Sequence, residues 1–263
     1  MELLSKKDVK LILETIRKAG EAVMDEYNHQ DPSIDYKSDE SPITKADLRS
    51  NECINEGLTN LSIDYPILSE ENKILSFEER KKMPIMWCVD PLDGTKEFIN
   101  KNGEFAICIA LISDHKSVAG FVYEPVKDRL FYALEGEGAW LEEKGNKSEL
   151  SVKTISANDE QLVFGVSRSH RSDDQQAYIN QFKNPAYLSK GSILKMIAIT
   201  TGEIDIYPRF DEKTKEWDIA AGQIILEEAG GKVIHKVTGD PISYNKESLQ
   251  SPCLLYTSPS PRD

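Results

Sequence analysis

Two carboxylates in the run DPLDGT at positions 90–95 are the residues of this sequence most clearly suited to chemistry. Asp90 and Asp93 lie three positions apart, directly after the apolar run 85–89, which predicts a buried strand. A proline stiffens the turn and a glycine lets it bend, so we expect both carboxylates to face one site. Neighbouring carboxylates raise each other's pKa unless a cation lies between them. Oxygen ligands of this kind suit Mg²⁺ or Mn²⁺ rather than Zn²⁺.

The end of the same run has the features of a phosphate-binding turn. The backbone N–H groups of Gly94 and Thr95 are free at the start of a predicted helix over 95–99, and helix N-termini bind phosphate readily. The alternative interpretation is an acidic turn whose Thr95 only caps that helix.

Acidic residues also end two other apolar segments. Glu70 and Glu71 follow a predicted short strand at 64–69, and Asp218 begins a predicted helix over 217–229, where it could serve only as an N-cap. Buried carboxylates without counter-ions are costly, and the sequence offers no nearby basic residues to pair with all of them. A shared metal site accounts for these acidic positions together.

Hydrophobic periodicity predicts the elements that must position these carboxylates. Apolar residues at helical spacing predict an amphipathic helix over 8–27 and a second helix over 46–61. Short apolar runs between turn residues over 105–141 are typical of an antiparallel meander. Strands and helices alternate beyond that point, with strands at 162–166 and 204–207 and helices near 172–183, 191–202 and 217–229.

Two segments predict how the chain is divided. The lysine- and glycine-rich stretch 142–148 is the predicted boundary between a first half, residues 1–148, with the metal motifs and the meander, and a second half, 149–249, with the substrate pocket. The run SPCLLYTSPSPRD continues no pattern and resembles translated cloning or adapter sequence. We therefore predict that residues 250–263 are a non-native, poorly packed tail, and the sequence leaves open whether the native chain continues past Leu249.

Composition narrows the classes of function. With 32 Lys and Arg against 45 Asp and Glu, the formal net charge is −13, which argues against nucleic acid or an anionic membrane as the main partner. Phosphorylated substrates are still allowed, because bound metal ions supply positive charge locally. The four cysteines are widely spaced without a CxxC pair, so we expect a reducing cytoplasm, with peripheral attachment at the inner membrane as an alternative. No apolar run reaches the roughly 18–20 residues that a membrane helix needs, and the charged N-terminus is unlike a signal peptide.

Four motifs resemble, in order and spacing, those of the inositol monophosphatase superfamily: SPITKAD at 41–47, LSEE at 68–71, DPLDGT at 90–95 and WDIAAG at 217–222. The resemblance covers roughly residues 8–249. It implies a mixed α/β fold, the layered αβαβα sandwich of the sugar-phosphatase type. It also implies a phosphomonoesterase that uses two or three Mg²⁺ ions, for which Mn²⁺ could substitute.

The resemblance further implies two overlapping sets of metal ligands. One ion would be held by Glu70, Asp90 and the carbonyl of Leu92, and a second by Asp90, Asp93 and Asp218. The first ion would activate the attacking water, and the second would stabilise the departing ribose oxygen.

The catalytic residues implied by the resemblance surround the same turn. Thr95, hydrogen-bonded to Asp47, would orient the attacking water and help to deprotonate it, with assistance from Glu71. The backbone N–H groups of Gly94 and Thr95 would hold the phosphate that is removed.

Within the superfamily, three segments are similar to the bacterial CysQ-type 3′(2′),5′-bisphosphate nucleotidases: KEFI at 96–99, GSILK at 191–195 and IYPRF at 206–210. Ile193 departs from that pattern, in which we expect a second serine.

In related nucleotidases, the phosphate that stays on the substrate is bound by residues that match His170, Ser192, Lys195 and Arg209. Lys and Arg suit this role because they form direct charge-assisted hydrogen bonds with phosphate. As alternatives, Lys195 would be a solvated lysine on a helix and Arg209 would form a salt bridge within a loop.

Together these features and the resemblance predict a Mg²⁺-dependent phosphatase that hydrolyses adenosine 3′,5′-bisphosphate to AMP and phosphate in sulfur assimilation and nucleotide salvage. The resemblance also implies sensitivity to Li⁺. Inositol monophosphate or a sugar bisphosphate is the alternative substrate, and an inactive metal- or nucleotide-binding regulator is the alternative class of function. The sequence does not decide between a monomer and a homodimer, or among 3′-, 2′- and sulfate-bearing nucleotides.

Overall fold

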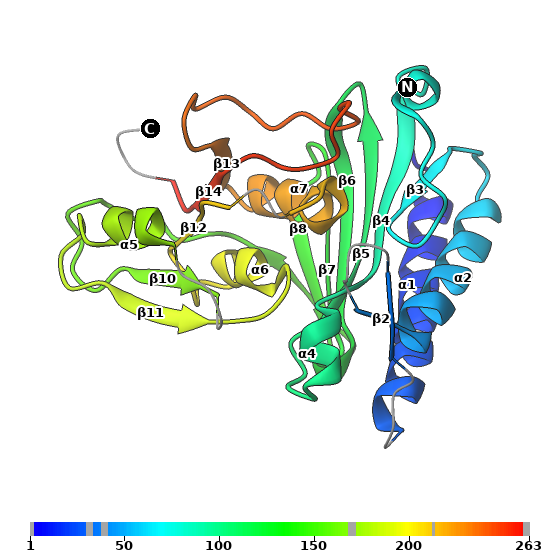
Figure 1. The fold of residues 1–263 in the computed structure, drawn as a ribbon, viewed down its shortest axis with the longest axis horizontal. Helices are drawn as coiled ribbons and strands as arrows, with labels where there is room; N and C mark the ends of the chain where they lie inside the picture. The colour runs from blue at the N-terminus through cyan, green and yellow to red at the C-terminus, as the bar shows by residue number, and fades with distance from the viewer. Residues whose placement is uncertain (1–2, 30–33, 38–41, 168–171, 212–213, 260–263) are drawn as a thin grey trace.

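Helical layers and β-sheets alternate through the computed structural model, which describes residues 3–29, 34–37, 42–167, 172–211 and 214–259 (Figure 1). Helices α1 (Lys6–Asn28) and α2 (Lys45–Thr59) cover one face of a seven-stranded sheet. Helices α6 (Leu194–Thr200) and α7 (Ala220–Glu228) lie between that sheet and a five-stranded sheet. Helix α5 (Asp173–Ile179) packs on the outer face of the five-stranded sheet. This arrangement confirms the predicted αβαβα sandwich.

Capping boxes determine where the first two helices begin. Ser5 and Asp8 exchange side-chain and backbone hydrogen bonds at the start of α1, and Thr44 and Asp47 do the same at the start of α2. Both helices occur where the periodicity predicts them, and their apolar stripes pack against the large sheet. Because Asp47 completes the second capping box, its carboxylate is held in place and buried.

The seven-stranded sheet has the strand order β3-β4-β5-β6-β7-β8-β9, in which only β3 and β4 are parallel neighbours. Its strands are β3 (Ile67–Ser69), β4 (Ile85–Asp93), β5 (Ala106–Ser113), β6 (Lys116–Glu124), β7 (Arg129–Leu134), β8 (Ala139–Glu143) and β9 (Asn146–Leu150). Side chains alternate between the two faces, so that Trp87 and Val89 pack toward α1 and α2 while Met86 and Cys88 pack toward α6 and α7. The predicted meander is therefore confirmed.

The five-stranded sheet has the order β11-β10-β12-β14-β13. Its strands are β10 (Val163–Val166), β11 (Ala186–Ser189), β12 (Ile206–Arg209), β13 (Lys232–His235) and β14 (Leu254–Thr257). The same core cluster contains residues from both sheets and from α6 and α7, so the two sheets share one hydrophobic interior. The sequence analysis did not predict β11 or β13, which are short and have no strong alternation.

Short elements complete the chain around the loops: β1 (Ile34–Tyr36), β2 (Pro42–Thr44), α3 (Phe77–Arg80), α4 (Thr95–Ile99), the 3₁₀ turns η1 (Pro125–Lys127) and η2 (Glu216–Asp218). β1 and β2 pair as a small antiparallel ribbon beside α4. Within the described ranges, none of the helices combines the length and the apolar character needed to cross a bilayer.

The end of the chain is packed, and the prediction of a poorly packed tail is wrong for the described residues 250–259. β14 lies between β12 and β13 and pairs antiparallel with both. Leu254 and Tyr256 are fully buried on the inner face, and Tyr256 stacks on Tyr207 with ring centroids 5.1 Å apart. An apolar four-residue run can fill an inner strand whatever surrounds it in the sequence. The non-native origin of this segment stays a prediction.

The segment predicted as a boundary, 142–148, is a β-hairpin and not an open linker. It contains the end of β8, a two-residue turn and most of β9. Lys144 and Gly145 have φ of 51° and 77°, the left-handed pair that closes a tight hairpin. A composition rich in lysine and glycine is therefore explained by turn geometry. The division into halves 1–148 and 149–249 stays a prediction.

Burial of β14 predicts a measurable contribution to stability. Leu254→Ala should lower the free energy of unfolding by about 2–5 kcal/mol, because it removes a fully buried side chain from the shared core. Urea denaturation followed by circular dichroism measures this change. Val237→Ala, at a side chain that is 79% exposed, is the control and should stay within about 0.5 kcal/mol of the parent. Equal midpoints for the two variants would show that β14 is not part of the folded sheet.

Candidate active site

Strand pairing brings the first two carboxylates together. β3 runs parallel to β4 with Ser69 opposite Val89, and the Glu70 N–H donates to the Val89 carbonyl at 3.1 Å. Glu70 and Asp90 therefore emerge side by side at the ends of the paired segments. The turn η2 contacts β4 and contributes Asp218. One oxygen from each of these three carboxylates lies within 4.8 Å of the other two, which is an arrangement able to hold a metal ion.

A β-bulge lies between the two carboxylates of the DPLDGT run, and the two accept hydrogen bonds from different parts of the chain. Asp90 pairs with Cys108 and Asp93 with Ala106, so β4 gains one residue relative to β5 between these positions. Asp90 accepts a hydrogen bond from the Leu92 N–H at 3.0 Å, whereas Asp93 accepts one from the Ile193 N–H at the start of α6. Asp93 is not one of the three clustered residues, although the sequence analysis expects both carboxylates to face one site.

Burial raises the pKa of three carboxyl groups in this region, those of Asp90, Asp93 and Asp218. The pKa of Asp90 lies well above its usual value because of burial and the neighbouring charges of Glu70, Asp93 and Asp218. Burial, with the Asp93 charge, raises the pKa of Asp218 to about 7. Burial also raises the pKa of Asp93 to about 6, although the Ile193 N–H and the charge of Lys195 oppose it. The possible metal ligands of the cluster are carboxylate oxygens, and the neighbouring cations do not balance their charge. The cluster therefore fits a hard divalent cation.

Asp218 also accepts the Lys215 N–H at 2.8 Å while it belongs to the acidic cluster, but it is not the N-cap of α7, a position that Ile219 occupies. The capping alternative for Thr95 does not hold, because Gly94 occupies the cap position of α4 and no side-chain cap is formed. Instead the Thr95 hydroxyl donates to Asp47 at 3.2 Å. Burial raises the pKa of Asp47, although hydrogen bonds from Thr44 and Thr95 oppose the increase.

Lys37 is a site residue that the sequence analysis missed. Its Nζ lies 2.6 Å from Glu70 Oε1 and 2.5 Å from Glu71 Oε1. Burial opposes the charge on Lys37, but the two glutamates raise the pKa of the ammonium. Burial raises the pKa of Glu71, and Lys37 limits that shift. Lys37 follows the short strand β1 and belongs to no motif, so only the folded chain shows that it faces these acids.

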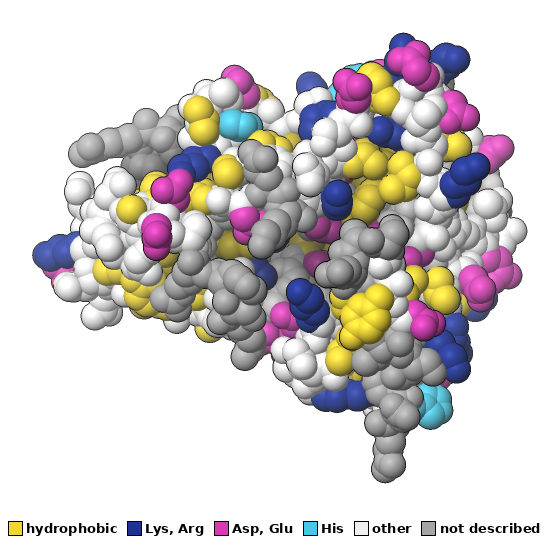
Figure 2. All heavy atoms as spheres, in the orientation of Figure 1, with side chains coloured by type: hydrophobic (Ala, Val, Ile, Leu, Met, Phe, Trp, Pro, Cys, Tyr) yellow, Lys and Arg dark blue, Asp and Glu magenta, His cyan; other side chains and the backbone are white. Residues whose placement is uncertain are grey.

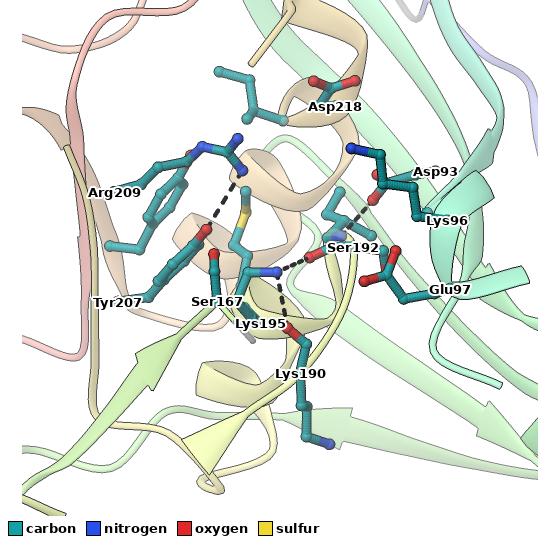
Figure 3. A pocket seen from close by; sticks show the side chains of 15 residues that line it. Asp93, Lys96, Glu97, Ser167, Lys190, Ser192, Lys195, Tyr207, Arg209 and Asp218 are labelled. Atoms are coloured by element: carbon teal, nitrogen blue, oxygen red, sulfur yellow. Dashed lines mark hydrogen bonds between the residues drawn. The ribbon is translucent and has the colours of Figure 1, made fainter. Parts of the chain in front are cut away.

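A cavity of about 300 Å³ begins at Asp218 and Asp93 and extends away from the acidic cluster. Figure 2 shows a hollow between the two sides of the molecule, with side chains of both charge signs around it. In Figure 3, Lys96 and Glu97 lie on one side of the cavity, while Tyr207 and Arg209 face them from the other. The cavity therefore joins an acidic end to a cationic wall.

The residues predicted to bind the retained phosphate lie in this cavity where the structure describes them. Lys195 is only 5% exposed, and its Nζ donates to the carbonyls of Lys190 at 3.0 Å and Ser192 at 2.9 Å, so it is not a solvated helix lysine. Arg209 donates to Asp211 at 3.3 Å, as the salt-bridge alternative expects, but its buried Nε has no partner among the described residues. His170 lies outside the described residues.

Ile193, at which the nucleotidase pattern predicts a serine, contacts Asp93 through its backbone. The backbone N–H of Ile193, not its side chain, donates to the Asp93 carboxylate. The side chain is 4% exposed and packs in the core beside Gly222, where an added Cβ would collide with it. A residue of any type at this position can supply the N–H.

The raised carboxyl pKa values predict how pH and metal control stability. Asp218, with a pKa near 7 when folded and about 3.9 when unfolded, binds more protons in the folded state between these values, so stability falls as pH rises through that window. The metal-free protein should therefore weaken from about pH 4 to 7, and saturating Mg²⁺ at pH 7 should raise its Tm by about 5–10 °C.

Differential scanning calorimetry in EDTA and in Mg²⁺ checks this prediction. Asp218→Asn should lose most of the Mg²⁺-induced increase in Tm and should flatten the pH dependence relative to the parent protein. An unchanged Mg²⁺ response in Asp218→Asn would contradict the assignment of this carboxylate to a cation site.

Comparisons with known proteins agree with the geometry. The sequence model of the Inositol monophosphatase family matches residues 6–252. The chain is 41% identical over 249 residues to the 3′(2′),5′-bisphosphate nucleotidase CysQ of Salmonella typhimurium, covering 94% of this chain and 98% of that protein. It is 39% identical over 243 residues to the Escherichia coli K12 enzyme of the same name, covering 92% and 96% of the two chains.

Solved structures give the same relationship. The crystal structure of CysQ from Bacteroides thetaiotaomicron, described as a bacterial member of the inositol monophosphatase family, superposes with a TM-score of 0.82 at 34% identity, covering 98% of this chain and 99% of that one. An inositol monophosphatase from Thermotoga maritima, at 23% identity and a TM-score of 0.77, covers 95% and 91% and shows the shared fold alone. The motifs, the fold and the full-length matches coincide, and the chain belongs to the inositol monophosphatase family.

Proposed function

We propose that this protein is a Mg²⁺-dependent 3′(2′),5′-bisphosphate nucleotidase that hydrolyses adenosine 3′,5′-bisphosphate to AMP and phosphate. One observation carries the proposal: Asp218 belongs both to the carboxylate cluster and to the wall of the cavity that contains Lys195 and Arg209. A substrate with two phosphates could place one at the acidic, metal-binding end and the other at the cationic wall. Full-length identity of about 40% to two CysQ enzymes supports this substrate class.

The proposed ligand sets are those that the family resemblance implies, and the clustering of Glu70, Asp90 and Asp218 supports them. Glu70, Asp90 and the Leu92 carbonyl would hold one ion, and Asp90, Asp93 and Asp218 a second. Bound Mg²⁺ would supply Lewis-acid activation of water and stabilisation of the departing oxygen. In the second set, the Ile193 N–H donates to one oxygen of Asp93, and the other oxygen would bind the ion.

The Thr95–Asp47 pair provides a path for the proton. As the oxygen of the attacking water bonds to phosphorus, its proton passes to Thr95 Oγ1, and the Thr95 proton passes to Asp47 along the 3.2 Å hydrogen bond. The bond from phosphorus to the ribose oxygen breaks, and solvent returns a proton to that oxygen. Burial raises the pKa of Asp47, which makes it a better proton acceptor. Glu71 would assist from beside Lys37.

The two phosphates are held by different groups. The N–H groups of Gly94 and Thr95 would hold the phosphate that is removed, since Gly94 has φ of 97° and begins α4. Ser192, Lys195 and Arg209 would hold the phosphate that stays, since all three line the cavity and the two cationic side chains suit phosphate. His170 completes the expected set.

Further proposals concern the cellular setting. We expect action on a small nucleotide in the cytoplasm, where the free cysteines, two of them buried on β4 and β5, would stay reduced. The net charge of −13 supports a substrate that is a free nucleotide rather than a nucleic acid.

Substitution of Arg209 should impair hydrolysis of the bisphosphate but not hydrolysis of esters with a single phosphate. Arg209→Met should raise KM for adenosine 3′,5′-bisphosphate by about 30- to 1000-fold, since loss of a buried charge-assisted contact costs about 2–4 kcal/mol, and should leave hydrolysis of 3′-AMP unchanged. Phosphate release from both substrates and from inositol monophosphate measures this. Arg17→Met, which breaks an ion pair to Asp128 on the opposite face of the large sheet, is the control. A preference for inositol monophosphate would overturn the substrate assignment.

Substitution of Thr95 should slow the chemical step without weakening metal binding. Thr95→Val should lower kcat by about 10²- to 10⁴-fold, because it removes the hydroxyl that relays the proton to Asp47. The Mg²⁺-induced increase in Tm should be retained. Thr95→Ser keeps the hydroxyl and should recover most of the activity. Full activity in Thr95→Val would exclude the proton path through this side chain.

A further inference from the structure

Glu216 is a buried carboxylate that the proposed chemistry does not use. It lies two residues before Asp218 in η2 and is 1% exposed. Its oxygens accept the Asn245 N–H at 2.7 Å, the Lys246 N–H at 3.1 Å and the Lys246 ammonium at 2.8 Å. Each of these donors belongs to the loop before β14, so this carboxylate is bound by the loop rather than being directed into the acidic cluster.

Arg80, from a different segment of the chain, binds the same loop. It is 3% exposed and lies at the end of α3, in the connection between β3 and β4. Its Nη1 donates to Asn245 Oδ1 at 2.8 Å and to the Lys246 carbonyl at 3.1 Å, and the Asn245 side-chain amide donates back to the Arg80 carbonyl at 2.8 Å. Its Nε donates to the Leu75 carbonyl at 3.2 Å. Asn245 has φ of 55°, a conformation that asparagine tolerates better than most residues.

These contacts join two segments that carry different metal-ligand candidates. The β3–β4 connection has Glu70 at its beginning and leads into the strand that carries Asp90, while η2 carries Asp218. The residues Arg80, Asn245, Lys246 and Glu216, which we call the Glu216 network, form a continuous hydrogen-bonded bridge between them, buried except for the Lys246 side chain. A buried polar network whose members are all paired holds its parts rigidly.

We propose that Glu216 is a positioning residue that holds η2 against the β3–β4 connection, so that Asp218 shares a cation with Glu70 and Asp90. The carboxylates of the cluster repel one another, so their approach must be held by contacts outside the cluster. Groups that orient metal ligands typically change metal affinity by 10- to 100-fold when they are removed. This inference rests on the divalent-metal part of the proposed function and not on the identity of the substrate.

A purely stabilising ion pair is the competing explanation, and Asp205 offers a matched control. Asp205 is 3% exposed, accepts the Val163 N–H at 2.7 Å and pairs with the Lys153 ammonium at 2.6 Å. It therefore repeats the chemistry of Glu216, a buried carboxylate with a backbone donor and a lysine. Its position just before β12 connects it to none of the segments that carry the clustered carboxylates.

The test compares Glu216→Gln with Asp205→Asn in the full chain, stripped of metal. Isothermal titration calorimetry with Mg²⁺ gives the dissociation constant of the ion. Differential scanning calorimetry of the metal-free protein gives the Tm. Glu216→Gln should weaken Mg²⁺ binding by about 10-fold or more, whereas Asp205→Asn should lower the Tm yet keep the dissociation constant within about twofold of the parent. Parent-like Mg²⁺ binding by Glu216→Gln would overturn the proposal.

A second variant keeps the test decisive if Glu216→Gln does not fold. The Lys246 side chain is 31% exposed, so Lys246→Met removes the ammonium with less effect on the interior. Lys246→Met should also weaken Mg²⁺ binding. The double variant Glu216→Gln/Lys246→Met should bind Mg²⁺ no more weakly than Glu216→Gln alone, because both changes break one network. Parent-like binding by Lys246→Met, or additive losses in the double variant, would contradict the network. A parent protein that binds no Mg²⁺ would instead overturn the proposed function.

Discussion

The repulsion among three carboxylates that the fold forces together is the constraint on which this structure depends. Glu70, Asp90 and Asp218 place oxygens within 4.8 Å of one another, in surroundings that raise the pKa of Asp90 and Asp218. Such a cluster is unfavourable for the metal-free chain, because burial and like charges both disfavour ionisation. A hard divalent cation removes both penalties, so the instability of the empty cluster is also the source of its affinity.

The fold meets that constraint through strand pairing and through a turn that packs against the paired strands. Glu70 and Asp90 follow from the parallel pairing of β3 with β4, and a one-residue bulge directs Asp93 toward α6. Asp218 comes from a turn more than 120 residues further along the chain and is held by hydrogen bonds outside the cluster. Asp90 lies on a strand of the shared core, and Glu70 and Asp218 are joined directly to packed elements, which limits how far the three ligands can separate.

Positive charge is distributed on both sides of the acidic cluster. Lys37 lies against Glu70 and Glu71 on one side, and Lys195 and Arg209 line the cavity on the other. A chain with a net charge of −13 thus presents a local cationic wall next to a local anionic centre. A ligand with two anionic groups would be oriented by this asymmetry alone, because only one of the groups can reach the cation-binding end.

The sequence by itself determined the main helices, the meander and the acidic motifs, because helix faces, strand alternation and a turn such as DPLDGT are local patterns. The order of the layers was predicted only through the resemblance of the motifs to a known family. Tertiary structure alone decided three features that depend on contacts between distant residues. Lys37 reaches the glutamates, the Ile193 N–H binds the Asp93 carboxylate, and 254–257 becomes an inner strand rather than a loose tail. Periodicity shows which face of a segment is apolar, but not which partner covers it, since pairing partners lie far away along the chain.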